Sequence, residues 1–217
     1  MVKLKERRKM QIFDWTDKIN ETELKIVTQA LNENKLIVFP TETVYGIAGN
    51  GLTLSVVNNL YQAKKRDYSK PFTLMVNDIT KIKDIAYVSE NEEKVIKKFM
   101  PGPITLILKK KDCISNLVTA NSDTVGVRIP NHKIALSILK SVDYPLATSS
   151  ANISGSVNNS NIEDIINDLE NYVDIFIKGN ISSNLLASTV VEIKNNEVNI
   201  LRNGIISKEN IEEVIRK

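Results

Sequence analysis

The sequence predicts an α/β protein built on an open, twisted β-sheet of mixed strand direction that is flanked by helices. Two observations lead to this class. Short apolar runs typical of buried strands alternate along the chain with amphipathic segments of helical period. In the last third, two strand-like runs are joined by Asn195-Asn196, which is typical of a tight hairpin turn, so at least one strand pair is antiparallel. Interleaved helices together with a hairpin predict a mixed sheet.

The first elements follow from capping and apolar spacing. Thr22 is the expected N-cap of a helix whose apolar residues recur on one face up to Leu31. An apolar run over residues 36–39 predicts a buried strand that opens into a polar loop over 41–46. Thr53 is the expected cap of a second helix, whose inner side is apolar.

The middle of the chain continues the alternation. A strand is expected over 72–76. Ser89 and Glu92 have the spacing of a capping box, and the helix that they start should end before Pro101 because proline cannot continue a helix. The Pro-Gly-Pro turn that follows leads into a strand over 104–108.

The remaining elements complete the pattern. Ser160 and Glu163 have capping-box spacing and predict one further helix start. The other expected elements are strands over 124–129, 146–149, 173–177, 189–193 and 198–201, a helix over 133–142, and a closing helix from about Lys208.

Composition limits the class of protein. The chain has 217 residues, of which 42% are apolar, and its net charge is +3, which is too small for a surface built throughout to hold nucleic acid. One cysteine, Cys113, and one histidine, His132, exclude an internal disulfide and a Cys/His metal cage. No apolar run approaches a membrane span, and we expect a cytoplasmic protein with a basic extension over residues 1–20 and one domain over 21–217.

Hydroxyl and basic residues recur beside the predicted strand ends, where open α/β sheets bind ligands. Each residue alone has a simpler explanation, because threonine favours strands and serine favours turns. As a set they indicate a binding site: Thr43, Thr105, Arg128, Thr148, Ser150, Ser188 and Arg202.

Basic and small residues suggest how that site holds an anion. The basic run over 64–70 fits a clamp on phosphate oxygens or a solvated charge run, and the segment 149–155 fits an anion-binding nest or an ordinary polar turn. Arg128 and Arg202 interrupt or end apolar runs, so each needs an anion nearby, either an internal carboxylate or a ligand. Glu42 is expected to orient its loop rather than to act as a base.

Several familiar chemistries are not supported by the sequence. It contains neither G-x-x-x-x-G-K-[ST] nor G-x-G-x-x-G. No nucleophile elbow surrounds His132, for which we expect a pocket-wall or surface position. The residues alone therefore predict a basic, hydroxyl-lined cleft for a small polyanion, with the reaction left open.

A series of motifs resembles those of the Sua5/YrdC/YciO family in order and approximate spacing, from about residue 22 to the end of the chain. The motifs are FPTETVYG (39–46), KKR (64–66) with SKP (69–71), PGPIT (101–105), VRIP (127–130), SSANISG (149–155), STVV (188–191) and ILR (200–202). Several motifs in one order make this resemblance more specific than any single pattern.

The resemblance implies a YrdC-like fold and the synthesis of threonylcarbamoyl-AMP from L-threonine, bicarbonate or CO2, and ATP. A carbamate formed on the threonine nitrogen would attack the α-phosphate of ATP. The product would then pass to a separate transferase complex that installs t6A, the threonylcarbamoyl-adenosine modification, in tRNA. Mg2+ is expected to bind the phosphates of ATP. We expect neither a set of protein ligands for it nor a tightly bound organic cofactor.

The resemblance also implies residue roles. Catalytic and charge-balancing roles fall on Lys64, Arg66 and Lys70. The expected ATP-binding residues are Arg66, Lys70, Thr105, Ser150, Asn152, Asn158 and Arg202. The expected threonine-binding residues are Thr43, Lys109, Arg128, Thr148 and Ser188.

The chain departs from the family pattern in three places. Many relatives have a histidine where this chain has Met75, and the run Phe72–Met75 is similar to the YciO branch. The SSANISG motif and Arg202 favour the synthase branch. The additional C-terminal domain of longer Sua5 proteins is not expected.

A different class of function is an RNA-binding module, or a YciO-like nucleotide- and RNA-binding protein without synthase activity. A basic cleft and a basic N-terminal arm would permit weak binding of tRNA or double-stranded RNA. The small net charge and the lack of aromatic stacking motifs argue against RNA binding as the main activity.

Overall fold

The computed structural model of the protein describes residues 10–154, 161–181 and 186–216. Its strands are β1 (Gln11–Asp14), β2 (Ile37–Phe39), β3 (Gly46–Asn50), β4 (Thr73–Met75), β5 (Ile104–Lys109), β6 (Thr124–Arg128), β7 (Leu146–Ser150), β8 (Ile175–Lys178), β9 (Thr189–Lys194) and β10 (Glu197–Arg202). Its helices are α1 (Glu21–Asn32), α2 (Leu54–Ala63), α3 (Ile79–Ile85), α4 (Glu90–Phe99), α5 (Asn116–Thr119), α6 (Lys133–Lys140), α7 (Ile162–Leu169) and α8 (Lys208–Arg216).

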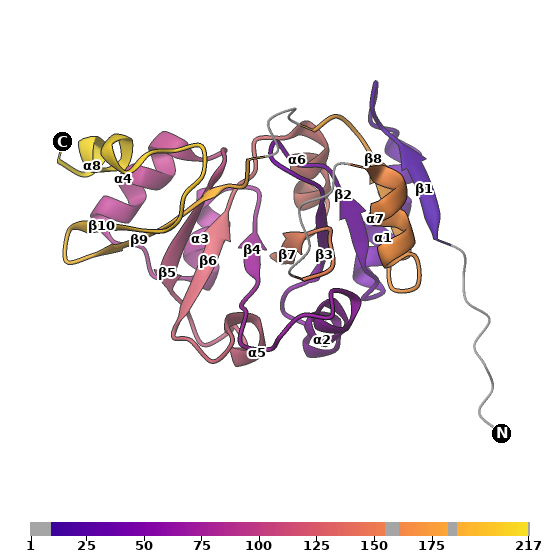
Figure 1. Cartoon of the computed structure of the whole chain (residues 1–217), viewed down its shortest axis with the longest axis horizontal. Helices are drawn as coiled ribbons and strands as arrows, with labels where there is room; N and C mark the ends of the chain where they lie inside the picture. The colour runs from indigo at the N-terminus through magenta and orange to yellow at the C-terminus, as the bar shows by residue number, and fades with distance from the viewer. Residues whose placement is uncertain (1–9, 155–160, 182–185, 217) are drawn as a thin grey trace.

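The strands form one mixed sheet in the order β1-β8-β2-β3-β7-β4-β6-β5-β9-β10. The parallel pairs are β1 with β8, β2 with β8, β4 with β6, and β5 with β9. The other neighbouring strands are antiparallel. The sheet twists from β1 to β10, with helices α1 and α7 near the first end and α4 and α8 near the other (Figure 1). The predicted fold class, an open mixed α/β sheet, is confirmed.

The half of the sheet around β2 and β8 is buried on both faces. Ile37 and Phe39 pack in a cluster with residues of α1 and α6, whereas Val38, between them, packs in the second cluster on the opposite face. Because side chains alternate along a strand, an unbroken apolar run is what a strand covered on both faces requires.

In the half around β4, β5 and β6, one face packs in the core, and the other is open over part of its area. Ile104, Leu106 and Leu108 pack in the same core as residues of α4 and α8, whereas Thr105 and Ile107 face a cavity on the other side. This alternation of apolar and cavity-lining residues along one strand explains why the polar residues of the sequence analysis gather on one face.

The helix N-termini show which of the predicted capping residues form capping hydrogen bonds. The Ser89–Glu92 capping box is present, with each side chain bonded to the backbone of the other residue. The first helix is capped by Asn20 rather than Thr22, because the Asn20 side chain accepts from the amides of Thr22 and Glu23 at 3.0 and 3.3 Å. Thr53 occupies an N-cap position without a side-chain capping bond.

Asn161, and not Ser160, caps α7, with its side chain accepting from the Glu163 amide at 3.0 Å. Ser160 lies outside the described residues. The predicted hairpin between β9 and β10 is confirmed, because Asn195 and Asn196 both have positive φ, 52° and 63°, as a type I′ turn requires.

Elements without a strong local signal were missed. Residues 1–20 were expected to precede the domain, but Gln11–Asp14 forms an edge strand paired with β8, and Trp15 is buried. The expected loop after Pro40 is followed directly by β3, which contains two glycines and pairs with β2 and β7. The short helices α3 and α5 were also missed. In the described part of the chain, no helix is long and apolar enough to cross a membrane.

Candidate functional site

A cavity of about 770 Å³ opens on the face of β4–β7 that carries Thr73, Thr105 and Thr148, beside the part of that face that packs with α6. Nine of the residues singled out from the sequence line it: Thr43, Arg66, Lys70, Thr105, Arg128, Thr148, Ser150, Ser188 and Arg202. They come from segments far apart in the chain, so the sheet brings them together. The predicted basic, hydroxyl-lined cleft is therefore present.

Strand register explains how one wall of the cleft is built. Thr105 on β5 pairs with Val190 on β9, which in turn pairs with Arg202 on β10. A register shift between Ile200 and Arg202 leaves one extra residue, Leu201, in β10. This bulge turns Arg202 to the face of Val190, and bulges are common beside functional sites for this reason.

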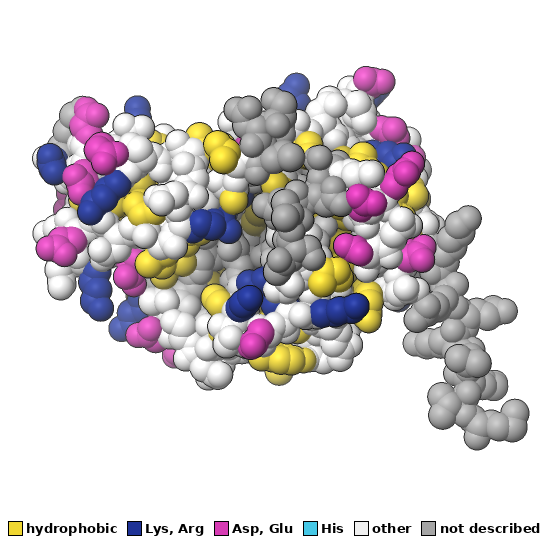
Figure 2. All heavy atoms as spheres, viewed as in Figure 1, with side chains coloured by type: hydrophobic (Ala, Val, Ile, Leu, Met, Phe, Trp, Pro, Cys, Tyr) yellow, Lys and Arg dark blue, Asp and Glu magenta, His cyan; other side chains and the backbone are white. Residues whose placement is uncertain are grey.

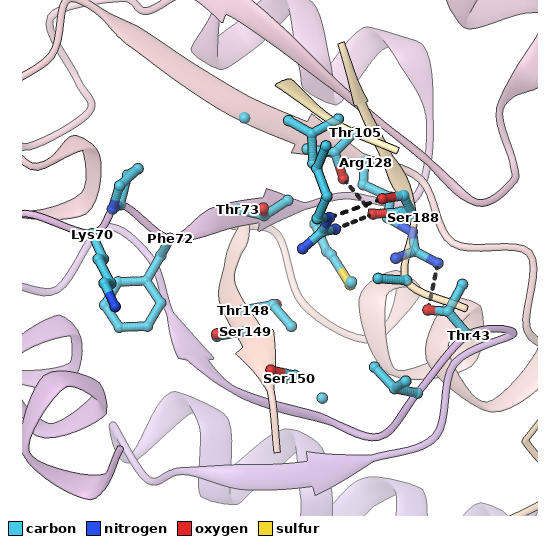
Figure 3. Close-up of a pocket in the computed structure, with 18 of the residues that line it drawn as sticks. Thr43, Lys70, Phe72, Thr73, Thr105, Arg128, Thr148, Ser149, Ser150 and Ser188 are labelled. Atoms are coloured by element: carbon cyan, nitrogen blue, oxygen red, sulfur yellow. Dashed lines mark hydrogen bonds between the residues drawn. The ribbon is translucent and has the colours of Figure 1, made fainter. Parts of the chain in front are cut away.

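Hydrogen bonds fix the polar groups of this wall (Figure 3). The Arg202 guanidinium donates from NH2 to Ser188 Oγ at 2.9 Å and from Nε to the Ser188 carbonyl oxygen at 3.1 Å. The Ser188 and Thr105 hydroxyls are 3.0 Å apart. Burial lowers the pKa of Arg202 first, and the charge of Arg128 lowers it further, so an anion here would relieve repulsion between two arginines.

The floor of the cleft is formed by a second row of paired residues that runs across the sheet. Thr148, Thr73, Gly126 and Ile107 are paired in that order on β7, β4, β6 and β5, and all four line the cavity. A Cβ atom at Gly126 would lie 3.2 Å from the Thr105 side chain, so glycine leaves space at the floor. Sequence reasoning missed Thr73 and Gly126, although both alternate with core residues along predicted strands.

Arg128 is paired with an internal carboxylate, which is one of the two alternatives expected from the sequence. Its NH2 group lies 2.8 Å from Glu42 Oε1 and donates to Thr43 Oγ1 at 3.1 Å. Both side chains are largely buried, with exposed fractions of 6% for Arg128 and 17% for Glu42. Among the described residues, both Glu42 carboxylate oxygens and Arg128 Nε lack a well-directed hydrogen bond, so charge holds this pair. Glu42 is thus the internal partner of Arg128, which also lines the cavity.

Arg66 and Lys70 lie on a compact turn at the other side of the cleft. Arg66 donates from Nε to the Lys70 carbonyl at 3.0 Å and from NH2 to the Pro71 carbonyl at 2.9 Å, and it lies over the Phe72 ring at 5.2 Å. The Tyr61 hydroxyl also reaches the Lys70 carbonyl at 3.1 Å. Burial lowers the pKa of Arg66. These contacts place both cations at the cavity edge.

Three of the predicted site residues that the structure describes do not line the cavity. Lys109 ends β5, four residues beyond Thr105 and therefore about 13 Å further along the strand. It is exposed, with its ammonium 5.8 Å from the Tyr87 ring, so the structure does not bring it together with the other residues expected to bind threonine. Lys64 and Asn152 are buried behind the lining, and Asn158 lies outside the described residues. His132 contacts the Asn180 carbonyl oxygen at 2.8 Å, away from the cavity.

The charge of the lining favours anions. It contains four cationic side chains and no Asp or Glu, and the described residues hold no group of three or more His, Cys, Asp or Glu that could bind a metal. On the face shown in Figure 2, some Lys and Arg side chains lie around the middle and others at the end near α8, while most acidic ones gather toward the two ends, near α8 and α7. A protein-held Mg2+ site does not fit this lining, so any Mg2+ would enter as part of the nucleotide substrate.

The sequence profile of the Sua5/YciO/YrdC family, described as "Telomere recombination", matches residues 29–204. The chain belongs to this family. It is 36% identical to a putative threonylcarbamoyl-AMP synthase of Methanocaldococcus jannaschii, over 87% of this chain and 90% of that protein. It is 34% identical to the threonylcarbamoyl-AMP synthase of Bacillus subtilis, over 96% of this chain and 62% of that protein.

Solved structures agree with this assignment. A crystal structure of Pyrococcus abyssi Sua5 complexed with L-threonine is 33% identical and has a TM-score of 0.89, covering 94% of this chain and 60% of that one. Escherichia coli YciO, at 22% identity and a TM-score of 0.84 over 93% of this chain and 99% of its own, shows the same fold. The chain spans about three fifths of the length of its Pyrococcus and Bacillus relatives.

Proposed function

We propose that this chain is an L-threonylcarbamoyladenylate synthase, which makes threonylcarbamoyl-AMP and diphosphate from L-threonine, bicarbonate and ATP. The observation that carries the proposal is the convergence of four cations and a set of hydroxyls in one cavity, where no described lining residue is an Asp or Glu and Glu42 pairs with Arg128 from behind the lining. Similarity to proteins named threonylcarbamoyl-AMP synthase supports the same activity. The run Phe72–Met75 is similar to the YciO branch, whereas the SSANISG motif and Arg202 favour the synthase.

The cavity has two ends suited to the two larger substrates. Lys70 lies on one side of the cavity, and Thr43, Arg128 and Ser188 lie on the other (Figure 3). We assign the side of Arg66 and Lys70 to the ATP phosphates. The opposite side would hold threonine, because the Arg128 cation suits its carboxylate. Thr148 and Ser150, on β7, lie between the two ends.

The reaction needs positioning and charge neutralisation more than a protein nucleophile. Bicarbonate and the threonine amine would condense to a carbamate with loss of water. A carbamate oxygen would then form a bond to the α-phosphorus of ATP as the bond to the β-phosphate oxygen breaks, releasing diphosphate. Arg66 and Lys70 would neutralise the charge on the ATP phosphates from their side of the cavity. Arg202, which donates to Ser188 on the threonine side, would meet the α-phosphate where the two substrates join, and the fixed walls would align the attacking oxygen.

The product is a mixed anhydride that water destroys, so it must be consumed soon after release. We infer that a separate transferase complex takes the threonylcarbamoyl group from it to tRNA, forming t6A, in the cytoplasm. Direct binding of tRNA to this cleft is not required by that sequence of reactions.

The proposal is tested by diphosphate release from purified protein. With Mg·ATP, L-threonine and bicarbonate together, diphosphate should accumulate, and omission of either threonine or bicarbonate should abolish release. Replacement of L-threonine by D-threonine is a matched control that keeps every functional group. Release that is indifferent to threonine would refute the proposal.

A further inference from the structure

Lys64 is a fully buried lysine that lies outside the cavity lining. It follows α2 directly as its C-cap residue and is only 1% exposed. Among the described residues, no carboxylate forms an ion pair with it. A buried ammonium is costly unless its protons are bonded, so its environment must supply acceptors.

Those acceptors are backbone carbonyl oxygens of the segment that follows β7. Lys64 Nζ donates to the carbonyl of Ser150 at 2.5 Å and to the carbonyl of Asn152 at 2.6 Å. In return, the Lys64 carbonyl accepts from the Ser154 amide at 2.9 Å. Three hydrogen bonds thus join this one residue to the segment 150–154, and two of them are charge-assisted.

The joined segment forms part of the cavity wall. Ser150 lines the cavity, and its hydroxyl donates to Asn152 Oδ1 at 2.5 Å. Arg66, two residues after Lys64, lines the cavity as well. Lys64 therefore connects the wall that carries Ser150 to the turn that carries Arg66, while Lys64 itself does not line the cavity.

We propose that Lys64 is a positioning residue, which fixes the segment 150–154 against the end of α2 so that Ser150 and Arg66 face the nucleotide together. This role replaces the catalytic one expected from the sequence, and it rests on the proposed function for its effect on ATP. The segment itself contributes no acidic side chain, so only an intact set of carbonyl acceptors accommodates the charge.

Electrostatics are consistent with this placement. Burial lowers the pKa of Lys64 to about 7, and the nearby charge of Arg66 acts in the same direction. Hydrogen bonds from the ammonium to two carbonyls favour the charged form and oppose these effects. A lysine with this pKa would react readily with acylating reagents near neutral pH if solvent reached it.

A kinetic comparison tests the role. Lys64→Met leaves two buried carbonyls without their donor, and we expect KM for ATP to rise by about tenfold or more while kcat at saturating ATP changes by less than about threefold. Lys64→Arg retains a donor and should keep KM for ATP within about fivefold of wild type. The matched control is Lys98→Met on α4, which removes an exposed charge outside the cavity lining and should leave both parameters unchanged. A collapse of kcat in Lys64→Met with unchanged KM would indicate contact with reacting atoms and overturn the proposal.

A second measurement uses the wild-type protein and depends on neither turnover nor the folding of a variant. Native protein is treated briefly with acetic anhydride, with and without Mg·ATP, and modified lysines are located by peptide mass spectrometry. Lys64 should stay unmodified in both samples, and the exposed Lys65 should be modified in both. Modification of Lys64 in the free protein and its protection by Mg·ATP would overturn the proposal. Absence of any ATP-dependent reaction would instead refute the proposed function and leave the labelling result standing.

Discussion

The buried pair between Glu42 and Arg128 allows the structural and functional parts of the site to be separated. Arg128→Met removes the cation and leaves the Glu42 carboxylate, only 17% exposed, without its partner at 2.8 Å. Breaking a buried pair from one side costs about 3–5 kcal/mol in the free energy of unfolding. For a chain of this size, that loss corresponds to a decrease in Tm of about 6–20 °C.

The double variant Glu42→Leu/Arg128→Met replaces the pair with apolar side chains of similar size. Such replacements are often neutral or stabilising, so at least half of the lost stability should return. Activity should not return, because Arg128 also faces the cavity. The assay is a double-mutant cycle: urea unfolding and threonine-dependent diphosphate release for the wild type, both single variants and the double variant.

The cycle has a clear refuting outcome. If the double variant loses as much stability as the sum of the two single variants, the side chains contribute independently, and the inference that charge holds this pair is wrong. If the double variant regains activity together with stability, Arg128 acts only through folding and not on a substrate.

Three further predictions concern the cleft and the fold. Arg202→Met should raise KM for ATP by about tenfold to hundredfold, because the charge-assisted bonds to Ser188 and to phosphate are lost. Lys109→Met should leave kinetics unchanged, because Lys109 lies outside the cavity. Equal effects of the two variants in steady-state assays would contradict the assigned lining. Gly126→Ala places a methyl group on the cleft floor and should lower kcat/KM by about tenfold with little change in Tm. An unchanged kcat/KM would show that substrates do not reach the floor. Asn20→Ala should lower Tm by about 2–4 °C, because about 1 kcal/mol of helix capping is lost. Thr22→Ala should leave Tm unchanged. Thermal unfolding that ranks the two variants in the opposite order would show that Thr22 is the cap.

Local signals in the sequence were sufficient for most of the fold. The Ser89–Glu92 capping box depends only on residues within one turn, and the Asn195-Asn196 hairpin depends on two residues that tolerate positive φ. Strand β1 could not be found in this way, because its pairing partner, β8, lies more than 160 residues later in the chain. An edge strand of four residues has little pattern of its own.

The same distinction between local sequence signals and long-range contacts applies to the site. Arg202 could be identified because an arginine at the end of an apolar run needs an anion, but its direction depends on the bulge at Leu201, which the pairing with β9 produces. Lys109 shares a strand face with Thr105, yet the cavity ends before reaching it. Lys64 stands in a basic run, and only the path of the segment 150–154 determines that it is buried. Whether a side chain on a strand reaches the cavity, and whether it is buried behind the cavity lining, depends on segments far away in the sequence.

The central claim is that this cavity joins a carbamate of threonine to the α-phosphate of ATP. It is tested most directly by incubating the protein with 13C-bicarbonate, L-threonine and Mg·ATP and analysing the nucleotide products by mass spectrometry. The account predicts an AMP-linked product that contains threonine and one 13C atom, released together with diphosphate. Formation of ADP and phosphate, or of an AMP product without the label, would contradict it.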